Sequence, residues 1–438
     1  MLIKFSVENW KSFRDKVTLN MVASREKQHK ERLPFIEKYK LHLLPTAAIY
    51  GGNGSGKTKL WEAIAFAKRF VIRVTQPEST IPREYFKLDN KCAEQPSKFS
   101  FTLVAENTCY EFSFSVTANK VVEEKLVEIT GGKEKTLYHR EEGKKNISFA
   151  KNLQQDQRLE FVAKGTRENQ LFLTNSIDQK IENFQPVYDW FKHNLVLISP
   201  NSSSFSGLSK FIQEDAPASL PAENILSKFD TGITHLGGKN IPIENLPIPE
   251  AIKKSLLEDL SEGEDIFLFE QIILTKKSGA LLAKKLIAYH RSMDGQYIPF
   301  DFEDESAGTL RMLALLPPLS NICAHKASKV YIIDELDRCL HTLLTRTFLE
   351  TYLQSCSAST RSQLIFTTHD VLQMDQDLLR RDEIWITERN EQGCSSLFSF
   401  AEYKGIRYDK DIQKSYLRGH FGGIPKIILN GTHLKKKK

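Results

Sequence analysis

Alternating apolar and polar residues, with a period of two, occur in three segments of the first third of the chain. The segments cover residues 99–104, 110–116 and 121–129, and this period is typical of antiparallel strands with one buried face. We therefore expect residues 75–165 to form a β-rich lobe. Similar patterning over residues 2–7 and 17–22, on either side of a polar turn, predicts a hairpin at the start of the chain.

Helical spacing replaces this pattern between residues 168 and 199. Phe184, Val187, Trp190 and Phe191 are spaced to form one buried stripe on a helix. Residues 201–250 contain serine-rich and proline-rich pieces, which predict a loop-rich connection. We therefore expect residues 166–265 to form a helical, loop-rich insertion.

An apolar run at residues 330–333 and a second one at residues 364–366, within the stretch 363–370, predict fully buried strands. Residues 46–50 form a third such run, and an amphipathic stretch follows over residues 59–74. Strand character also appears over residues 267–275 and 281–290, ahead of a long helix expected after Gly308. The chain therefore predicts an α/β fold whose core combines residues 1–74 with residues 266–438.

Composition limits the class of protein. The 438 residues, of which 40% are hydrophobic, are enough for two or three lobes. No basic and apolar leader begins the chain, and no apolar run reaches the roughly 18 to 20 residues that span a bilayer. We therefore expect a cytoplasmic protein without membrane contact.

The cysteines and the net charge limit which metal sites and binding partners we expect. Six cysteines are scattered singly, which favours reduced thiols over a structural zinc site. The net charge of +6 permits contact with nucleic acid without indicating it. The only charge run, Lys435 to Lys438, is expected to be a solvated tail.

A complete phosphate-binding loop follows the first buried strand. It consists of Gly51, Gly52, Asn53, Gly54, Ser55, Gly56, Lys57 and Thr58. Its glycines allow backbone N–H groups to surround a β-phosphate, and the helix that follows adds partial positive charge. Lys57 can reach the β- and γ-phosphates, and the Thr58 hydroxyl can ligate Mg²⁺. The loop predicts binding of ATP or GTP with Mg²⁺.

Polar side chains also follow the two later buried strands. Asp334 and Glu335 come directly after residues 330–333, so that one carboxylate can hold hydrated Mg²⁺ while the other polarises the attacking water. We assign the metal to Asp334 and the catalytic water to Glu335. His369, just after residues 363–367, can donate a hydrogen bond to the γ-phosphate. These residues predict nucleotide hydrolysis.

Ser306-Ala-Gly308 stands directly before the expected long helix. A hydroxyl and free backbone N–H groups at a helix N-terminus can bind an anion. A single subunit has no phosphate of its own at this helix N-terminus. The motif therefore predicts a second protomer, whose nucleotide it would cover. The simpler alternative is a serine that only caps the helix.

In this order, the motifs resemble those of the ABC/SMC-type P-loop ATPases, and more narrowly a RecF- and SMC-like subgroup that includes bacterial abortive-infection ATPases. The matching features are the opening Val7-Glu-Asn-Trp-Lys-Ser-Phe-Arg14, the Walker A loop Gly51 to Thr58, the signature Ser306 to Gly308, Walker B Asp334-Glu335, the D-loop Leu336-Asp337, His341, the switch His369, Trp385, Phe229 to Ile233, and the ending Tyr416 to Pro425. Gln170 is a candidate for the Gln-containing loop.

The resemblance implies an ABC-type ATPase core with an appended antiparallel β-lobe and a helical insertion. It implies ATP as the nucleotide, and it places Lys11, Ser12, Ser306, Gly308 and Asp337 near the nucleotide. Each composite site of a head-to-tail homodimer or larger homo-oligomer would combine these groups from two protomers. Members of the subgroup suggest an anti-phage switch that controls a nuclease or toxin acting in trans, released by a phage-derived trigger.

Two other functions fit the same residues. One is a RecF- or SMC-like DNA-repair ATPase that clamps DNA, for which a contiguous basic stripe would be the distinguishing feature. The other is a nucleotide-gated scaffold with little turnover, against which an intact Glu335 argues.

Overall fold

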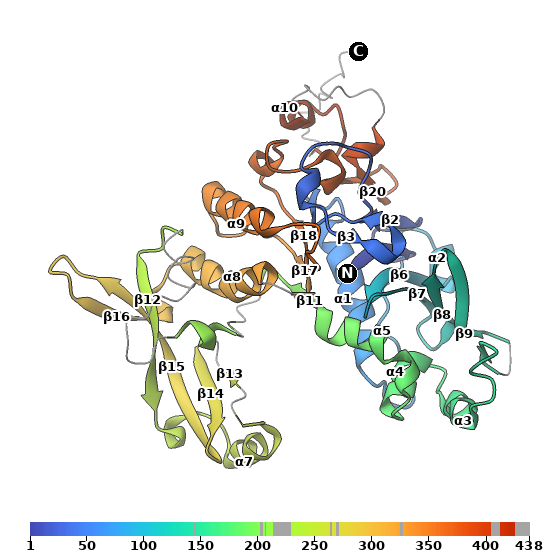
Figure 1. Ribbon diagram of the computed structural model, residues 1–438, viewed down its shortest axis with the longest axis horizontal. Helices are drawn as coiled ribbons and strands as arrows, with labels where there is room; N and C mark the ends of the chain where they lie inside the picture. Colours follow the sequence, from blue (N-terminus) through green and yellow to red (C-terminus); the bar gives the residue numbers. More distant parts are fainter. Residues whose placement is uncertain are drawn as a thin grey trace. The chain divides into compact units, whose positions relative to one another are not determined.

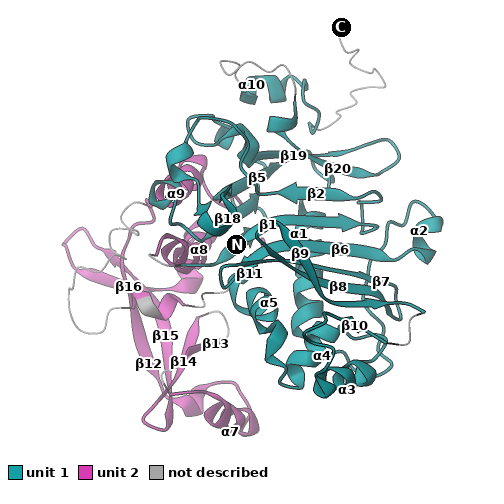
Figure 2. Cartoon of the chain, turned by 45° about the vertical axis from the view of Figure 1, so that its right-hand side comes forward, with its two compact units in different colours: residues 1–199, 325–336, 353–438 teal, residues 200–324, 337–352 magenta. Residues whose placement is uncertain are grey.

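The computed structural model describes residues 1–143, 146–201, 205, 207–212, 229–262, 265–268, 271–324, 327–403 and 412–424. The expected solvated tail at Lys435 to Lys438 lies outside these residues. The chain forms two compact units. The first contains residues 1–199, 325–336 and 353–438, and the second contains residues 200–324 and 337–352 (Figure 2).

A six-stranded sheet lies at the centre of the first unit (Figure 1). Its strands, in spatial order, are β11 (Leu195–Ile198), β17 (Val330–Ile333), β18 (Gln363–Thr367), β5 (Thr46–Tyr50), β19 (Ile384–Arg389) and β20 (Ser395–Ser399). The first five are parallel, and β20 is antiparallel to β19. Since parallel strands in register end at the same edge, the residues that follow β5, β17 and β18 come together. The predicted α/β class is confirmed.

A seven-stranded antiparallel sheet is the second large sheet of this unit. Its order is β10 (Ser148–Phe149), β9 (Lys133–Glu141), β8 (Val121–Thr130), β7 (Thr108–Val116), β6 (Ser97–Ala105), β1 (Leu2–Glu8) and β2 (Val17–Asn20). The predicted opening hairpin is confirmed by the β1–β2 pairing. Because β1 also pairs with β6, the hairpin and the expected β-lobe are parts of one sheet. A two-stranded sheet joins β3 (Phe35–Ile36) and β4 (Leu41–His42).

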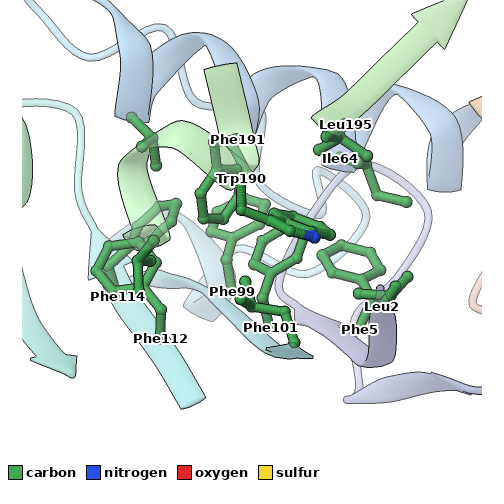
Figure 3. Packing of buried hydrophobic residues seen from close by; sticks show 14 of the residues in the cluster. Leu2, Phe5, Ile64, Phe99, Phe101, Phe112, Phe114, Trp190, Phe191 and Leu195 are labelled. Atoms are coloured by element: carbon green, nitrogen blue, oxygen red, sulfur yellow. The ribbon is translucent and has the colours of Figure 1, made fainter. Parts of the chain in front are cut away.

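One hydrophobic core connects the two large sheets through α1 (Lys57–Ile72). Apolar side chains of α1 recur at helical spacing and are buried together with residues of β1, β5, β6, β7 and β17. Aromatic rings dominate this core, as Figure 3 shows for Phe101, Trp190 and Phe191. The Phe101 and Phe191 ring centroids are 4.9 Å apart with their planes at 79°, an edge-to-face arrangement that stabilises aromatic pairs.

Short helices follow the antiparallel sheet: α3 (Gln157–Gly165), α4 (Phe172–Asp178), α5 (Gln185–Asp189) and a π-helical turn, Trp190–Asn194. Phe184, Val187, Trp190 and Phe191 are all buried in the same core, so the predicted stripe is confirmed. These helices belong to the first unit. A further short helix, α2 (Lys91–Glu94), precedes β6.

The second unit contains a five-stranded antiparallel sheet. Its strands are β12 (Ile233–Ile241), β15 (Ala280–Arg291), β14 (Ile272–Lys277) and β13 (Asp265–Leu268), with β16 (Tyr297–Asp301) paired to β15. The α-helices in the described part of this unit are α7 (Glu250–Asp259), α8 (Ala307–Cys323) and most of α9 (Thr342–Ser355). This division differs from the expected boundaries at residues 166 and 266, because β12 pairs with β15 across the second of them.

The ending of the described chain packs against β19. Gly422 and Gly423 have φ angles of 71° and 69°, and a Cβ on either would meet Glu388 or Ile386 at 2.5 Å. The Tyr416 hydroxyl, on α10 (Ile412–Leu417), donates to the Gly423 carbonyl at 2.9 Å. The tyrosine and glycines of the Tyr416 to Pro425 motif therefore have a packing role, whereas Pro425 lies outside the described residues.

No helix in the described part of the chain is both long enough and apolar enough to cross a membrane.

Candidate functional site

The loop between β5 and α1 adopts backbone conformations that favour glycine. Gly51, Gly54 and Gly56 have φ angles of 151°, 74° and 121°. A Cβ at Gly51 would lie 2.5 Å from the Ser55 Oγ atom, and a Cβ at Gly56 would lie 2.9 Å from the Ser395 Oγ atom. Both separations are shorter than ordinary contacts, so the loop keeps this shape only with glycine at these two positions.

Lys57 opens α1 and folds back over the loop. Its ammonium donates to the Gly51 carbonyl at 2.7 Å and to the Gly52 carbonyl at 3.3 Å. Only 5% of the residue is exposed. The amine is therefore held at the loop, beside the backbone N–H groups of the α1 N-terminus, where an anion would be stabilised.

Asp334 lies at the end of β17 and is fully buried. The Thr367 hydroxyl donates to its Oδ1 atom at 2.5 Å, and Thr58 also hydrogen-bonds to its carboxylate. Burial raises the pKa of Asp334, while the hydrogen bonds from Thr367 and Thr58 act in the opposite direction. The strand end and the loop thus bring one carboxylate and one hydroxyl into direct contact.

This pair of oxygen ligands fits Mg²⁺, which prefers hard oxygen donors and commonly takes only one or two from the protein. No group of three or more His, Cys, Asp or Glu side chains that could hold a metal occurs among the described residues. A site made of Thr58, Asp334 and nucleotide phosphates is therefore the arrangement that the residues support.

Glu335 has a φ angle of 50°, an uncommon conformation for a residue with a side chain. The Thr367 Oγ1 atom accepts a hydrogen bond from the Glu335 N–H at 2.8 Å, and the Thr367 carbonyl accepts one from the Leu336 N–H at 3.0 Å. Backbone strain of this kind costs about 1 to 3 kcal/mol and is concentrated at functional sites. The turn directs Glu335 toward His369, with 3.9 Å between Oε1 and Nε2.

Most of the phosphate loop, Glu335 and His369 line one pocket with a volume of about 970 Å³, entirely within the first unit. Its lining includes Lys11, Ser12, Gly52, Asn53, Gly54, Ser55, Gly56, Lys57, Thr58, Glu335 and His369, together with Lys59, residues 84–88, Arg389 and Gly393. A volume of this size suits a nucleoside triphosphate. The phosphate loop, the acidic strand end and the histidine are therefore brought together as their motifs require.

Lys11 and Ser12 lie at the pocket in different ways. The Lys11 ammonium is 2.8 Å from both Glu62 and Glu84. Burial opposes its charge, but hydrogen bonds to these carboxylates raise the pKa of Lys11 above its ordinary value. The Ser12 Oγ atom is buried and has no hydrogen-bond partner among the described residues, so it is placed to bond to a ligand.

Asn9 is a structural residue of this site that sequence reasoning missed. Its side-chain amide donates to the carbonyls of Cys92 at 2.8 Å and Gln95 at 2.9 Å, and its Oδ1 atom accepts from the Phe86 N–H at 3.1 Å. Asn9 is 4% exposed. The bond from the Phe86 N–H attaches residues 84–88, which form one wall of the pocket, to the asparagine of the opening motif.

We expect Asn9→Ala to destabilise the protein by about 2 to 4 kcal/mol, because it leaves several buried backbone groups without partners. Thermal or urea unfolding measures this effect. Asn119→Ala, at an exposed turn, is the control. If Asn9→Ala unfolded like the control, the assigned role of Asn9 would be wrong.

Arg389 and Gly393 were also missed. Arg389 ends β19 and Gly393 lies in the turn that follows, where the Arg389 Nε atom donates to the Gly393 carbonyl at 3.1 Å. Nothing in the local pattern distinguishes them from ordinary hairpin residues. Gln170, the candidate for the Gln-containing loop, is buried, and its carbonyl accepts from Arg140 at 2.6 Å. It is not among the residues that line the pocket.

Ser306, Gly308 and Asp337 belong to the second unit. The Ser306 Oγ atom accepts a hydrogen bond from the Thr309 N–H at 3.1 Å, which makes Ser306 the N-cap of α8. Ser306 is nevertheless exposed. A Cβ at Gly308 would lie 2.8 Å from the Cys339 carbonyl oxygen, so Gly308 permits the loop after Asp337 to approach the first turn of α8.

Comparison with known proteins identifies a family. The model of the family described as "AAA domain, putative AbiEii toxin, Type IV TA system" matches residues 47–375, well over half of the chain. No curated protein matches.

Solved structures give distant similarities. One is the "SmcHead bound to the C-winged helix domain of ScpA", with 14% identity, a TM-score of 0.39 and coverage of 91% of this chain and 97% of that one. Another is the "SMC head domain from Thermotoga maritima", with 12% identity, a TM-score of 0.34 and coverage of 91% and 98%. From the match over residues 47–375, which includes the phosphate loop and the acidic strand end, the chain belongs to the AAA-domain family of putative AbiEii toxins of type IV toxin–antitoxin systems.

Proposed function

We propose that this protein binds ATP with Mg²⁺ and hydrolyses it at composite sites shared between two protomers. The observation that carries the proposal is the pocket in which Lys57, Glu335 and His369 meet, with Asp334 and Thr58 in contact beside it. Three parallel strands supply these groups from one edge of the sheet.

Binding begins at the loop. Lys57 exchanges its carbonyl partners for the β- and γ-phosphates, and backbone N–H groups of the loop and of α1 surround the β-phosphate. Thr58 and Asp334 would hold Mg²⁺, which when bound would neutralise charge on the phosphates. The Ser12 hydroxyl, which has no partner among the described residues, would gain one from the nucleotide.

Hydrolysis depends on Glu335 and His369. The Glu335 carboxylate orients the attacking water and accepts its proton. The His369 Nε2 atom donates a hydrogen bond to the γ-phosphate, close enough to Glu335 to respond to the loss of that group. Both side chains are partly exposed, at 31% and 42%, so that a covering surface from another molecule would complete the exclusion of water.

Ser306 of a second protomer supplies that surface in our proposal. It is exposed at the start of α8, a 17-residue helix, whose N-terminus offers backbone donors and partial positive charge. ATP binding would then favour association of two protomers, because each nucleotide contacts both.

Two substitutions of Ser306 test this arrangement. Aspartate caps helices as well as serine does, so Ser306→Asp should leave the free energy of unfolding nearly unchanged while its charge repels the partner's triphosphate. Ser306→Arg should block the same surface sterically. We expect both variants to bind ATP as protomers and to lose most ATPase activity and ATP-dependent association. Normal turnover in both variants would contradict the composite site.

We further propose that the cycle switches a nuclease or toxin partner in anti-phage defence. The family description, which names a toxin and a toxin–antitoxin system, supports this role. Co-purification with the products of neighbouring genes, with and without ATP, tests it. Retention of DNA alone, with no protein partner, would favour the DNA-clamping alternative.

A further inference from the structure

The approach to Ser306 carries a pair of side chains that the proposed cycle does not use. Glu305 directly precedes Ser306, and its Oε1 atom is 2.6 Å from the Nε2 atom of His290. The exposed fractions are 6% for the Glu305 side chain and 25% for the His290 side chain. A pair this close and this sheltered is screened less by salt than a surface pair.

Three segments fix the position of the His290 ring. His290 lies on β15, opposite Ile233 of β12 and Ile298 of β16. Its ring centroid is 4.7 Å from that of Phe300. On another side, a Cβ at Gly232 would lie 3.3 Å from the His290 Nδ1 atom, so glycine leaves room for the imidazole at this point.

Glu305 is the charged group that contacts His290 among the described residues. Other carboxylates nearby have different surroundings. Glu303 accepts a hydrogen bond from Gln271 at 2.5 Å, Asp304 is exposed, and Asp301 pairs with Lys285 at 2.8 Å. The net charge just before Ser306 therefore depends on whether His290 carries a proton.

We propose that His290 is a positioning residue for the start of α8, and that its protonation controls how readily this helix end accepts the nucleotide of a second protomer. The inference rests on the composite site proposed above. Glu305 carries a negative charge beside the place where that site would receive a triphosphate. His290 holds this carboxylate in one orientation and, when protonated, neutralises it.

The direction of the effect follows from the charges. Protonated His290 and ionised Glu305 sum to zero, whereas neutral His290 leaves one negative charge that repels the incoming phosphates. Association through ATP should therefore be tighter at low pH and weaker at high pH. The binding of ATP to a single protomer, at the phosphate loop, should not follow this dependence.

ATP-dependent association can be measured by sedimentation at pH 6.5 and pH 8.0, with full-length Glu335→Gln protein as the parent so that hydrolysis does not intervene. We expect the parent to associate about threefold to fivefold more tightly at the lower pH, as for a half-sheltered ion pair. Adding His290→Gln keeps a hydrogen-bond donor but removes the ionisable group. At both pH values this variant should associate as weakly as the parent does at pH 8.0. Adding Glu305→Gln should give the tighter association at both.

His235→Gln is the matched control, because His235 lies on the same sheet and its ring stacks on that of Tyr289. It should keep the pH response of the parent. The inference is overturned if His290→Gln also keeps that response, or if Glu305→Gln weakens association. If the parent fails to associate with ATP at either pH, the composite site itself is wrong and the inference falls with it.

Discussion

Lys57→Ala should nearly abolish retention of ATP. The ammonium is held over the loop by the Gly51 and Gly52 carbonyls, whereas Lys59, the other lysine in the first turn of α1, pairs with Glu62 at 3.1 Å. Removing a charge-assisted contact with phosphate costs about 2 to 3 kcal/mol, which corresponds to a roughly 30- to 150-fold increase in Kd. Equilibrium binding of a fluorescent ATP analogue measures the change.

The control for Lys57→Ala is Arg69→Ala. Arg69 lies exposed in the last turn of the same helix, so its removal changes the net charge equally without affecting the loop. We expect Arg69→Ala to bind ATP like the unmodified protein. An unchanged Kd in a folded Lys57→Ala protein would show that the pocket around this loop is not the nucleotide site.

Glu335→Gln should stop hydrolysis while preserving binding. The amide has nearly the same shape as the carboxylate but cannot accept the proton of the attacking water. Removing a general base lowers turnover by about 10²- to 10⁴-fold. Because the Thr367 contacts of this turn are made by backbone N–H groups, the substitution should keep the backbone conformation. Bound ATP should then persist and hold protomers together.

Phosphate release and sedimentation with ATP measure the two effects of Glu335→Gln. Asp377→Asn, at an exposed position after β18, controls for loss of one carboxylate and should turn over normally. Hydrolysis by Glu335→Gln at the unmodified rate would refute the assignment of the base. Loss of hydrolysis without ATP-dependent association would separate the catalytic role of Glu335 from the shared site.

The pocket residues that could be predicted from the sequence are those that directly follow buried strands. Each apolar run was long enough to be a buried strand, and the residues after it had the chemistry of a phosphate or metal site. The parallel registers of β17, β18 and β5 then place Asp334, His369 and Gly51 at one edge. Local pattern was sufficient here because parallel strands in register leave little freedom in where their ends lie.

The wall of the pocket could not be predicted in the same way. Residues 84–88 have no periodic pattern, and Asn9 holds them through contacts that cross more than 70 positions of sequence. Lys11 was expected near the nucleotide from the opening motif, and it lines the pocket while pairing with Glu62 and Glu84. Glu62 and Glu84 are far from Lys11 in the sequence, so tertiary packing determined which carboxylates pair with this lysine.

Long-range pairing also decided the division of the chain. Composition suggested an insertion that ends near residue 265, but β12 pairs with β15 and the sheet continues to β16. The burial of a charged side chain is a second feature that only the tertiary structure decided. Arg380 is buried, and its Nε and Nη2 atoms donate to the two carboxylate oxygens of Asp382 at 2.8 and 2.7 Å. No local pattern predicts that a charged residue will be enclosed.

The sequence by itself determined the chemistry of this protein: a glycine loop with its lysine, an acidic pair and a histidine, each after a buried strand, because these features depend on neighbouring residues and on the period of the backbone. The tertiary structure alone decided how Asn9 holds the pocket wall, which residues form each compact unit, and that His290 meets Glu305. Those outcomes depend on contacts between distant segments, whose geometry is set by the packing of the whole fold and not by any one stretch of it.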